Sequence, residues 1–202
     1  MQAFPDIESL RHVCEDVKRH CEYAGLATRP TIKFRGTVKL HGTNGGVRIR
    51  EDGGLVAQGR NRELTIQNDN FGFAHYVSSR GYAFDALRRF FGLGNHDVTF
   101  YGEWCGQGIQ KKVAVSELPK HFVVFAVYDH TSEVWMSLFD YEFNDSVLEL
   151  LNEQNVWLIT QAPTYEVEID FNDPVPAAEV ISQYTLQVED ECPWGKFRCI
   201  LS

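Results

Sequence analysis

Short runs of β-branched and aromatic residues, separated by turn-forming residues, are the feature that most constrains how this chain can fold. Residues 47–50 and 55–58 flank Asp52-Gly53-Gly54. Because Asp and Gly tolerate the backbone conformation of a tight turn, a β-hairpin is predicted there. The other predicted strands are 31–39, 98–103, 122–128, 134–138 and 165–169. The run at 134–138 follows 122–128 closely enough to form a second hairpin across 129–133.

Segments with helical periodicity alternate with these strands. In residues 6–22 apolar side chains recur three or four positions apart, and Asp6 behind Pro5 is the predicted N-cap; the periodic positions are Ile7, Leu10, Cys14, Val17 and Cys21. Further helices are predicted over 70–91, with a break at 78–81, and over 140–154 and 177–184. We therefore predict an α+β fold, with mixed or antiparallel sheets and flanking helices, in a single domain spanning 1–202.

The charge of the chain is divided unevenly. The 202 residues contain 28 acidic and 19 basic residues, a net charge of −9, which argues against a generic basic nucleic-acid coat protein. Residues 1–112 nevertheless carry 16 basic and 12 acidic residues, a balance of +4, whereas residues 113–202 carry 3 and 16, a balance of −13. A polyanionic partner is therefore excluded only for the second half.

Cysteine usage and hydropathy place the chain among reduced, non-membrane proteins. Five cysteines form no C-x-x-C pair, which disfavours a zinc site or a disulfide scaffold, and Cys14 and Cys21 are predicted to be buried thiols. No apolar run is long enough to cross a membrane, and the first residues do not form a signal segment. We expect a cytoplasmic protein without a membrane partner.

The segment 37–46 carries the clearest chemical signal. Lys39 follows a predicted strand and precedes a turn rich in Gly, Thr and Asn, where the backbone can approach a ligand closely. A lysine that is partly desolvated there can act as a nucleophile. The alternative is that Lys39 is an ordinary surface lysine before a turn, and that His41 is structural.

Four motifs in order resemble one superfamily. Lys39-Leu40-His41-Gly42-Thr43-Asn44 resembles motif I of the covalent nucleotidyltransferases, the ATP-dependent ligases and capping enzymes, and His41 in place of Asp resembles the RNA ligase 2 branch. Gln58-Gly59-Arg60-Asn61-Arg62 is similar to the next motif, and Phe100-Tyr101-Gly102-Glu103-Trp104 to motif III. Phe122-Val123-Val124-Phe125-Ala126-Val127 is similar to motif IIIa. The resemblance covers about residues 4–196 and implies a nucleotidyltransferase (adenylation) domain.

The resemblance implies a role for each matched residue. Lys39 is the implied nucleophile, and the nucleotide-binding residues are Val38, Lys39, Arg60, Glu103 and Phe125. Glu103 would contact the ribose, Phe125 would stack on adenine and Arg60 would bind phosphate. His41, Asn44 and Arg62 would handle phosphate or the RNA end. Each has a plainer alternative: the two arginines as a solvated hairpin rim, Glu103 as a surface charge, and Phe122 and Phe125 as core residues.

The reaction that the resemblance implies is the joining of RNA ends. The lysine attacks ATP, in the presence of Mg²⁺ or Mn²⁺, to form lysyl–AMP. AMP then passes to an RNA 5′-phosphate, and an RNA 3′-hydroxyl displaces it.

Two later motifs of the family have no counterpart in this sequence. Motif IV is Glu-Gly followed by aliphatic residues, and motif V is Lys-x-Lys. The sequence contains no Glu-Gly and no Lys-x-Lys. Gln187–Lys196 resembles only the approach to motif IV, so the chain is expected to stop before it. The metal ligands are therefore not predicted, with Glu103 the only candidate, and adenylation is expected to be impaired.

Two other functions remain as alternatives. The first is a catalytically inactive module that binds a nucleotide, an RNA end or a protein. The second is a DNA ligase or capping enzyme, which His41 disfavours because those enzymes carry Asp at that position.

Overall fold

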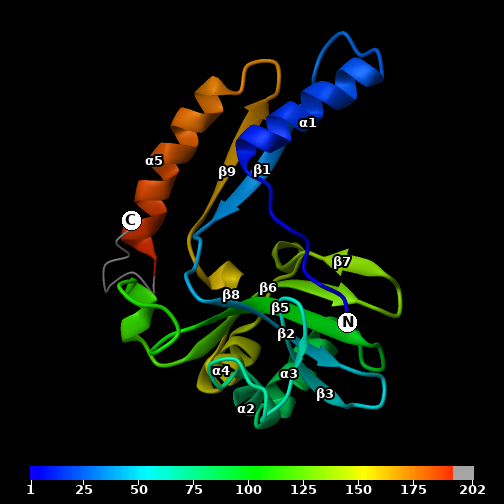
Figure 1. Ribbon diagram of the computed structural model, residues 1–202, viewed down its shortest axis with the longest axis vertical. Coiled ribbons are helices and arrows are strands. Elements are labelled where there is room, and N and C mark those ends of the chain that lie inside the picture. The colour runs from blue at the N-terminus through cyan, green and yellow to red at the C-terminus, as the bar shows by residue number, and fades with distance from the viewer. Residues whose placement is uncertain (193–202) are drawn as a thin grey trace. The chain divides into compact units, whose positions relative to one another are not determined.

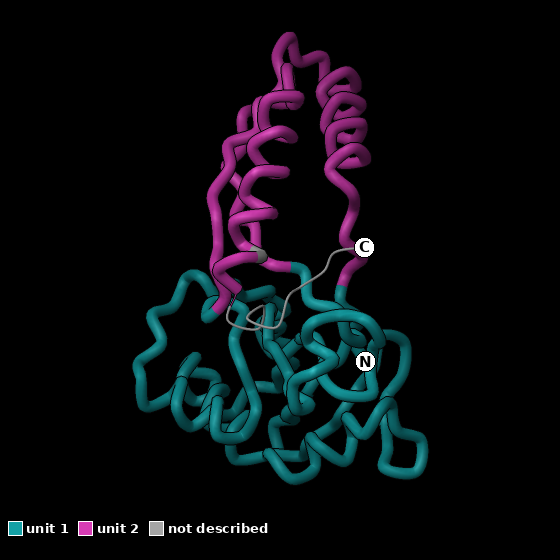
Figure 2. Tube along the Cα trace, turned by 90° about the vertical axis from the view of Figure 1, so that its left-hand side faces the viewer, with its two compact units in different colours: residues 1–4, 39–161, 197–202 teal, residues 5–38, 162–196 magenta. Residues whose placement is uncertain are grey.

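The computed structural model describes residues 1–192, and these form two compact units (Figure 2). The larger unit comprises residues 1–4 and 39–161, and the smaller comprises residues 5–38 together with the described residues from Ala162 onward. Each unit has its own β-sheet, one of seven strands and one of two. The prediction of a single domain over 1–202 stays a prediction.

The larger unit is built on an almost wholly antiparallel sheet (Figure 1). Its strands are β2 (Thr43–Ile49), β3 (Leu55–Gly59), β4 (Glu63–Leu64), β5 (Val98–Cys105), β6 (His121–Asp129), β7 (Val134–Met136) and β8 (Val156–Leu158). The order is β4-β3-β2-β5-β6-β7, and β8 pairs in parallel with β6. The helices are α2 (Phe73–Ser78), α3 (Gly81–Phe90) and α4 (Asp145–Glu153), with short 3₁₀ helices at Ala114–Glu117, Leu138–Asp140 and Ile159–Gln161.

Aromatic side chains fill the core between this sheet and helices α2 and α3. Phe122 on β6 is fully buried and its ring lies 5.0 Å from that of Phe73 and 6.1 Å from that of Phe84. Trp104 on β5 lies 5.4 Å from Phe73. Because successive residues of a strand alternate between faces, these contacts define one face of β5 and β6 as the packed face and leave the other for the site.

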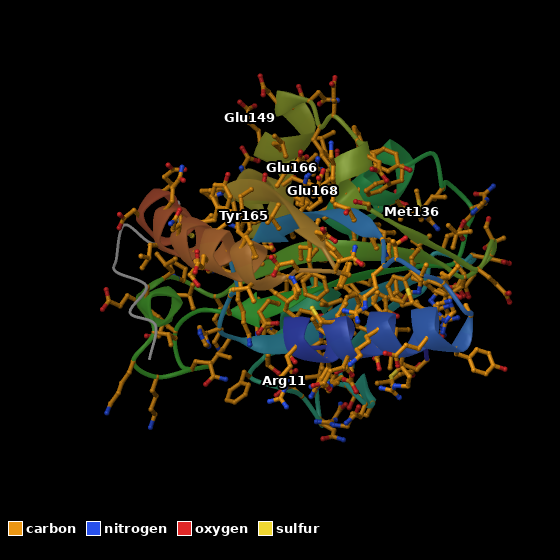
Figure 3. All side chains as sticks on the ribbon, turned by 90° about the horizontal axis from the view of Figure 1, so that it is seen from above. Arg11, Met136, Glu149, Tyr165, Glu166 and Glu168 are labelled. Carbon is orange, nitrogen blue, oxygen red and sulfur yellow. The ribbon has the colours of Figure 1, made fainter. Side chains whose placement is uncertain are left out.

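The smaller unit is a two-stranded sheet covered by two helices. Strand β1 (Thr31–Thr37) pairs antiparallel with β9 (Thr164–Asp170), and residues of α1 (Leu10–Tyr23) and α5 (Val175–Glu191) pack against the core residues of β9 (Figure 1). Strand β9 alternates as a half-buried strand should: Val167 and Ile169 are buried, whereas Glu166 and Glu168, both labelled in Figure 3, are exposed.

The structure confirms the α+β class and most predicted elements. The hairpin around Asp52-Gly53-Gly54 forms between β2 and β3, with Gly53 at φ +81°. The predicted helix over 70–91 is broken between α2 and α3 as expected, and β7 pairs antiparallel with β6. Sequence reasoning missed the short strands β4 and β8, which carry too few residues to show a period. It also made the last helix too short.

The first helix begins later than predicted. It starts at Leu10 with Ser9 as N-cap, whose hydroxyl accepts a hydrogen bond from the His12 amide at 3.4 Å, so the prediction of Asp6 as cap is wrong. Ile7 therefore lies outside the helix and is 86% exposed. Cys21 is buried as predicted, whereas Cys14 is only partly buried.

Two negative results concern residues 1–192. No helix among them is long and apolar enough to span a membrane. They also contain no group of three or more His, Cys, Asp or Glu side chains that could hold a metal ion.

Candidate functional site

The lysine singled out by the sequence lies in a loop between two strands. Strand β1 ends at Thr37 and β2 begins at Thr43, so Lys39 and His41 belong to neither. Both side chains are exposed. The expectation that Lys39 sits at a strand end and is partly desolvated is therefore wrong, because the chain leaves the sheet two residues earlier than the sequence pattern indicated.

Gly42 fastens this loop to the central strand of the larger unit. Its amide donates to Glu103 Oε1 at 2.8 Å, and its carbonyl accepts a hydrogen bond from Gln110 Nε2 at 3.0 Å. A Cβ at position 42 would collide with the carbonyl oxygen of Trp104, so this close approach requires glycine. The loop that carries Lys39 is thus held by β5 through its backbone.

Glu103 and Asn44 lie opposite each other on adjacent strands, β5 and β2. Glu103 is half-buried, and this burial raises its pKa to about 7, while the hydrogen bond from Gly42 and the charge of Lys39 act in the opposite direction. The Lys39 ammonium therefore stabilises the ionised carboxylate. A cation and a partly buried carboxylate are brought together here by residues 64 positions apart in the chain.

The two arginines of the second motif lie in the tight turn after β3. Both are exposed, and the turn is closed by a 2.8 Å hydrogen bond from the Gly59 amide to the Arg62 carbonyl. The Arg62 guanidinium donates to the carbonyl of Asn68 at 2.9 Å, so it already braces the loop that precedes α2. The predicted phosphate role of Arg60 stays a prediction.

Phe125 is set into the site face by a β-bulge. Tyr101 pairs with Ala126 and Gly102 with Val124, so Phe125 is the extra residue on β6. A bulge re-aims the side chain that it carries. The ring of Phe125 is half-buried and lies 4.9 Å from that of Phe4, edge to face, whereas Phe122 is fully buried in the core as the alternative for that residue supposed.

The structure adds residues that sequence reasoning missed. Tyr101 and Gln58 are buried on the site face, and both donate to the carbonyl of Gln2. Gln110 was missed although it follows the glycine-rich turn after β5. A single Gln or Tyr carries no periodic signal. Gln58 and Tyr101 stand within two of the matched motifs, but the resemblance assigned them no role.

A salt bridge occupies the far end of the same face. Arg48 on β2 lies opposite Thr99 of β5 and donates to both carboxylate oxygens of Asp97 at 2.7 and 2.6 Å. The Arg48 guanidinium lowers the pKa of Asp97, and Asp97 in turn raises the pKa of Arg48. These charges neutralise each other.

Val38 is half-buried and belongs to the smaller unit, so its predicted place in nucleotide binding stays a prediction. The tail motif Gln187–Lys196 lies partly outside the described residues.

Within the larger unit the geometry unites an exposed primary amine, a carboxylate with a raised pKa, an amide side chain and an aromatic ring. Such a set can bind a polar ligand with a flat ring and offer it a nucleophile.

Comparison with known proteins gives a family and a fold. A family model described as RNA ligase matches residues 32–181. Among solved structures, one mutant of the Naegleria gruberi RNA ligase with AMP and Mn has a TM-score of 0.56 at 20% identity, covering 90% of this chain and 47% of that chain. A second mutant, with ATP and Mn, has a TM-score of 0.57 with the same identity and coverage.

A third mutant of that ligase, in its apo form, has a TM-score of 0.56 at 21% identity and covers 89% of this chain and 46% of that chain. The chain thus spans about half the length of the solved structures that it matches. None of the curated proteins compared with the chain matches it.

Proposed function

The chain belongs to the RNA ligase family, and from that premise we propose that it binds ATP and forms a covalent lysyl–AMP on Lys39. The observation that carries the proposal is the hydrogen bond between the Gly42 amide and Glu103. It joins the loop of the nucleophile to the strand of the ribose-binding carboxylate, so that one rigid element positions both groups. The Naegleria gruberi ligase with ATP and Mn, whose fold this chain shares, supports the choice of nucleotide.

The proposed reaction begins with a displacement at phosphorus. The neutral amine of Lys39 attacks the α-phosphorus of ATP, a nitrogen–phosphorus bond forms, and the bond to pyrophosphate breaks. The exposed position of Lys39 allows its proton to leave to solvent. A 5′-phosphate oxygen of RNA then takes the AMP from the lysine, and an RNA 3′-hydroxyl attacks the activated phosphate and releases AMP.

The other residues act by binding. Glu103 accepts hydrogen bonds from the ribose hydroxyls, most strongly as the ionised carboxylate. Phe125 offers a ring to adenine, with stacking worth about 1–3 kcal/mol. Arg60 binds phosphate through its forked donors. His41 and Asn44 handle the α-phosphate or the RNA end. We assign Arg62 a bracing role first, because its guanidinium already holds the carbonyl of Asn68.

A divalent ion has no site of its own among residues 1–192, since no group of three or more ligand side chains converges there. A Mg²⁺ or Mn²⁺ ion would arrive on the ATP phosphates, which commonly supply most of its ligands.

We further propose that adenylation is slow in this chain. The sequence contains no Lys-x-Lys to neutralise the α-phosphate, and each missing donor of this kind costs about 10²–10³ in rate. The second candidate function is a module that binds ATP or an RNA end without catalysis.

Incubation with α-labelled ATP and Mg²⁺ or Mn²⁺ tests the proposal. We expect label on the wild-type chain and none on Lys39→Ala, while Lys33→Ala, a change at another exposed lysine, keeps it. Label that survives Lys39→Ala would refute the assigned nucleophile. A wild-type chain that binds ATP in calorimetry but takes up no label would support the binding module instead.

A further inference from the structure

Residues Gln2–Phe4, which we call the N-terminal strap, lie on the site face of the larger unit, and Figure 1 shows the N-terminus beside β5–β7. The Gln2 carbonyl accepts two hydrogen bonds, from Gln58 Nε2 at 2.9 Å and from the Tyr101 hydroxyl at 2.7 Å. Gln58 is 2% exposed and Tyr101 is fully buried. Two buried donors that converge on one backbone oxygen fix the path of the strap, because a buried donor without a partner is costly.

The sheet is shaped to make this grip. Gly46 on β2 lies directly opposite Gln58 on β3, and a Cβ at position 46 would stand 2.7 Å from Gln58 Cγ. The missing side chain at Gly46 thus leaves the space that the Gln58 side chain fills. The side-chain amide of Gln58, which binds the strap, is therefore held in place by the packing of β2 against β3.

The ring of Phe4 anchors the strap in an aromatic cluster. It lies 5.6 Å from the ring of Tyr101, 5.5 Å from that of Trp135 and 4.9 Å from that of Phe125. The contacts with Trp135 and Phe125 are edge to face, with interplanar angles of 87° and 69°. This is the favoured geometry for aromatic pairs, and it restricts the orientation of both partners.

Three residues that contact the strap either have a proposed nucleotide role or lie two positions from a residue that has one. Gln58 on β3 precedes Arg60, in the turn after that strand, by two positions, and Tyr101 precedes Glu103 by two positions on β5. Phe125 is itself the proposed adenine platform, and it lies in a bulge where ladder hydrogen bonds constrain it less. A ring at a bulge needs support from a neighbouring side chain if it is to present one fixed face.

We propose that Phe4 is a positioning residue for ATP: it holds the Phe125 ring in the orientation that stacks on the base, and the strap thereby sets the affinity for the nucleotide. The inference rests on the proposed function, since it requires that ATP bind at this face. It assigns the strap no part in the displacement at phosphorus.

The test compares Phe4→Ala, Phe4→Leu and Phe4→Tyr with the wild-type chain. The dissociation constant for ATP is measured by calorimetry, and the rate of lysyl–AMP labelling is measured at saturating ATP. We expect Phe4→Ala to weaken ATP binding about tenfold, since it removes the support of one stacking contact. Phe4→Leu should lie between, Phe4→Tyr should retain the wild-type affinity, and the labelling rate at saturation should stay within about twofold in all three.

The control is Phe90→Leu. Phe90 is a partly buried aromatic residue of α3 whose ring stacks on Phe143 at 4.5 Å, away from the strap. The Phe90→Leu substitution should lower the melting temperature about as much as Phe4→Leu does. It should leave the affinity for ATP unchanged. If Phe90→Leu weakened ATP binding equally, the effect of Phe4 would be general destabilisation and the inference would fail.

Unchanged affinity in Phe4→Ala would overturn the inference. Tighter binding would overturn it too, because Phe4 would then be covering the ring face that the base needs. If the wild-type chain bound no ATP, both the inference and the proposed function would be wrong. If the wild-type chain and Phe4→Ala bound ATP equally tightly, only the inference would be wrong.

Discussion

The two faces of the seven-stranded sheet differ in what covers them. On the packed face, Phe100, Trp104 and Phe122 are at most 1% exposed beneath α2 and α3. On the site face, Asn44, Glu103 and Phe125 are only half-buried. The same strands thus supply rigidity on one side and chemistry on the other. Because neighbouring residues of one strand point to opposite faces, a substitution at one position should affect stability and its neighbour should affect function.

The sharpest test of this division uses two phenylalanines of β6, three positions apart. Phe122→Ala should lower the free energy of unfolding by about 3–5 kcal/mol, because it opens a cavity among Phe73, Phe84 and Trp104. Phe125→Ala, at a half-buried ring, should cost about 1 kcal/mol and weaken ATP binding instead. Urea denaturation and calorimetry measure the two effects. Equal losses of stability would break the comparison.

Gly42→Ala tests how the site face holds the loop that carries Lys39, the proposed nucleophile. The new Cβ would collide with the Trp104 carbonyl and displace the amide that bonds Glu103. We expect lysyl–AMP formation to fall on the order of 10²-fold, since a small misplacement of a reacting group can cost that much. Gly94→Ala is the matched control, because nothing lies within 4 Å of a Cβ built there. A Gly42→Ala chain that labels normally would show that the loop does not need β5.

The raised pKa of Glu103 means that ionisation of this carboxyl group lowers the free energy of unfolding at neutral pH. Since the pKa rises from 4.5 to about 7 on folding, the contribution of Glu103 to stability is fully present below pH 4.5 and is lost as the pH rises through 7. Glu103→Gln should not suffer this loss. Its free energy of unfolding relative to the wild type should therefore increase by on the order of 2 kcal/mol between pH 4.5 and 8.

Denaturation series at several pH values measure that difference. Glu51→Gln, at an exposed carboxylate, serves as the control and should show no comparable change. A constant difference between Glu103→Gln and the wild type across this range would mean that the carboxylate titrates normally.

The smallest effect is expected at the Arg48–Asp97 pair, which lies at the end of the site face far from Glu103. Asp97→Asn should lower the free energy of unfolding by about 1 kcal/mol, since the pair is only partly buried and salt-bridges of this kind contribute modestly. The affinity for ATP should not change. A loss of ATP affinity in Asp97→Asn would extend the ligand-binding area along the whole of β2.

Much of the packed face could be predicted from the sequence, because burial imposes a period on it. The hairpin at Gly53 was predicted from its turn-forming residues, and the break between α2 and α3 was predicted as well. The site face was predicted only through its motifs. The bulge at Phe125 depends on the register between two strands, and the grip of Gln58 and Tyr101 on Gln2 joins residues up to 99 positions apart. Neither leaves a local pattern. The exposure of Lys39 followed from where β1 ends, which is the least predictable property of a strand.

The pairing of Gly46 with Gln58 has a consequence for how such a sheet can evolve. A larger residue at position 46 would displace the Gln58 side chain, so the two positions are expected to change together or not at all. Relatives that replace the glycine should carry a small residue in place of the glutamine, and they should then lack the amide that holds the N-terminal segment. If residues 46 and 58 vary together among members of the family, the family divides into two groups. In one group the first residues support the proposed nucleotide site, and in the other they are free to diverge.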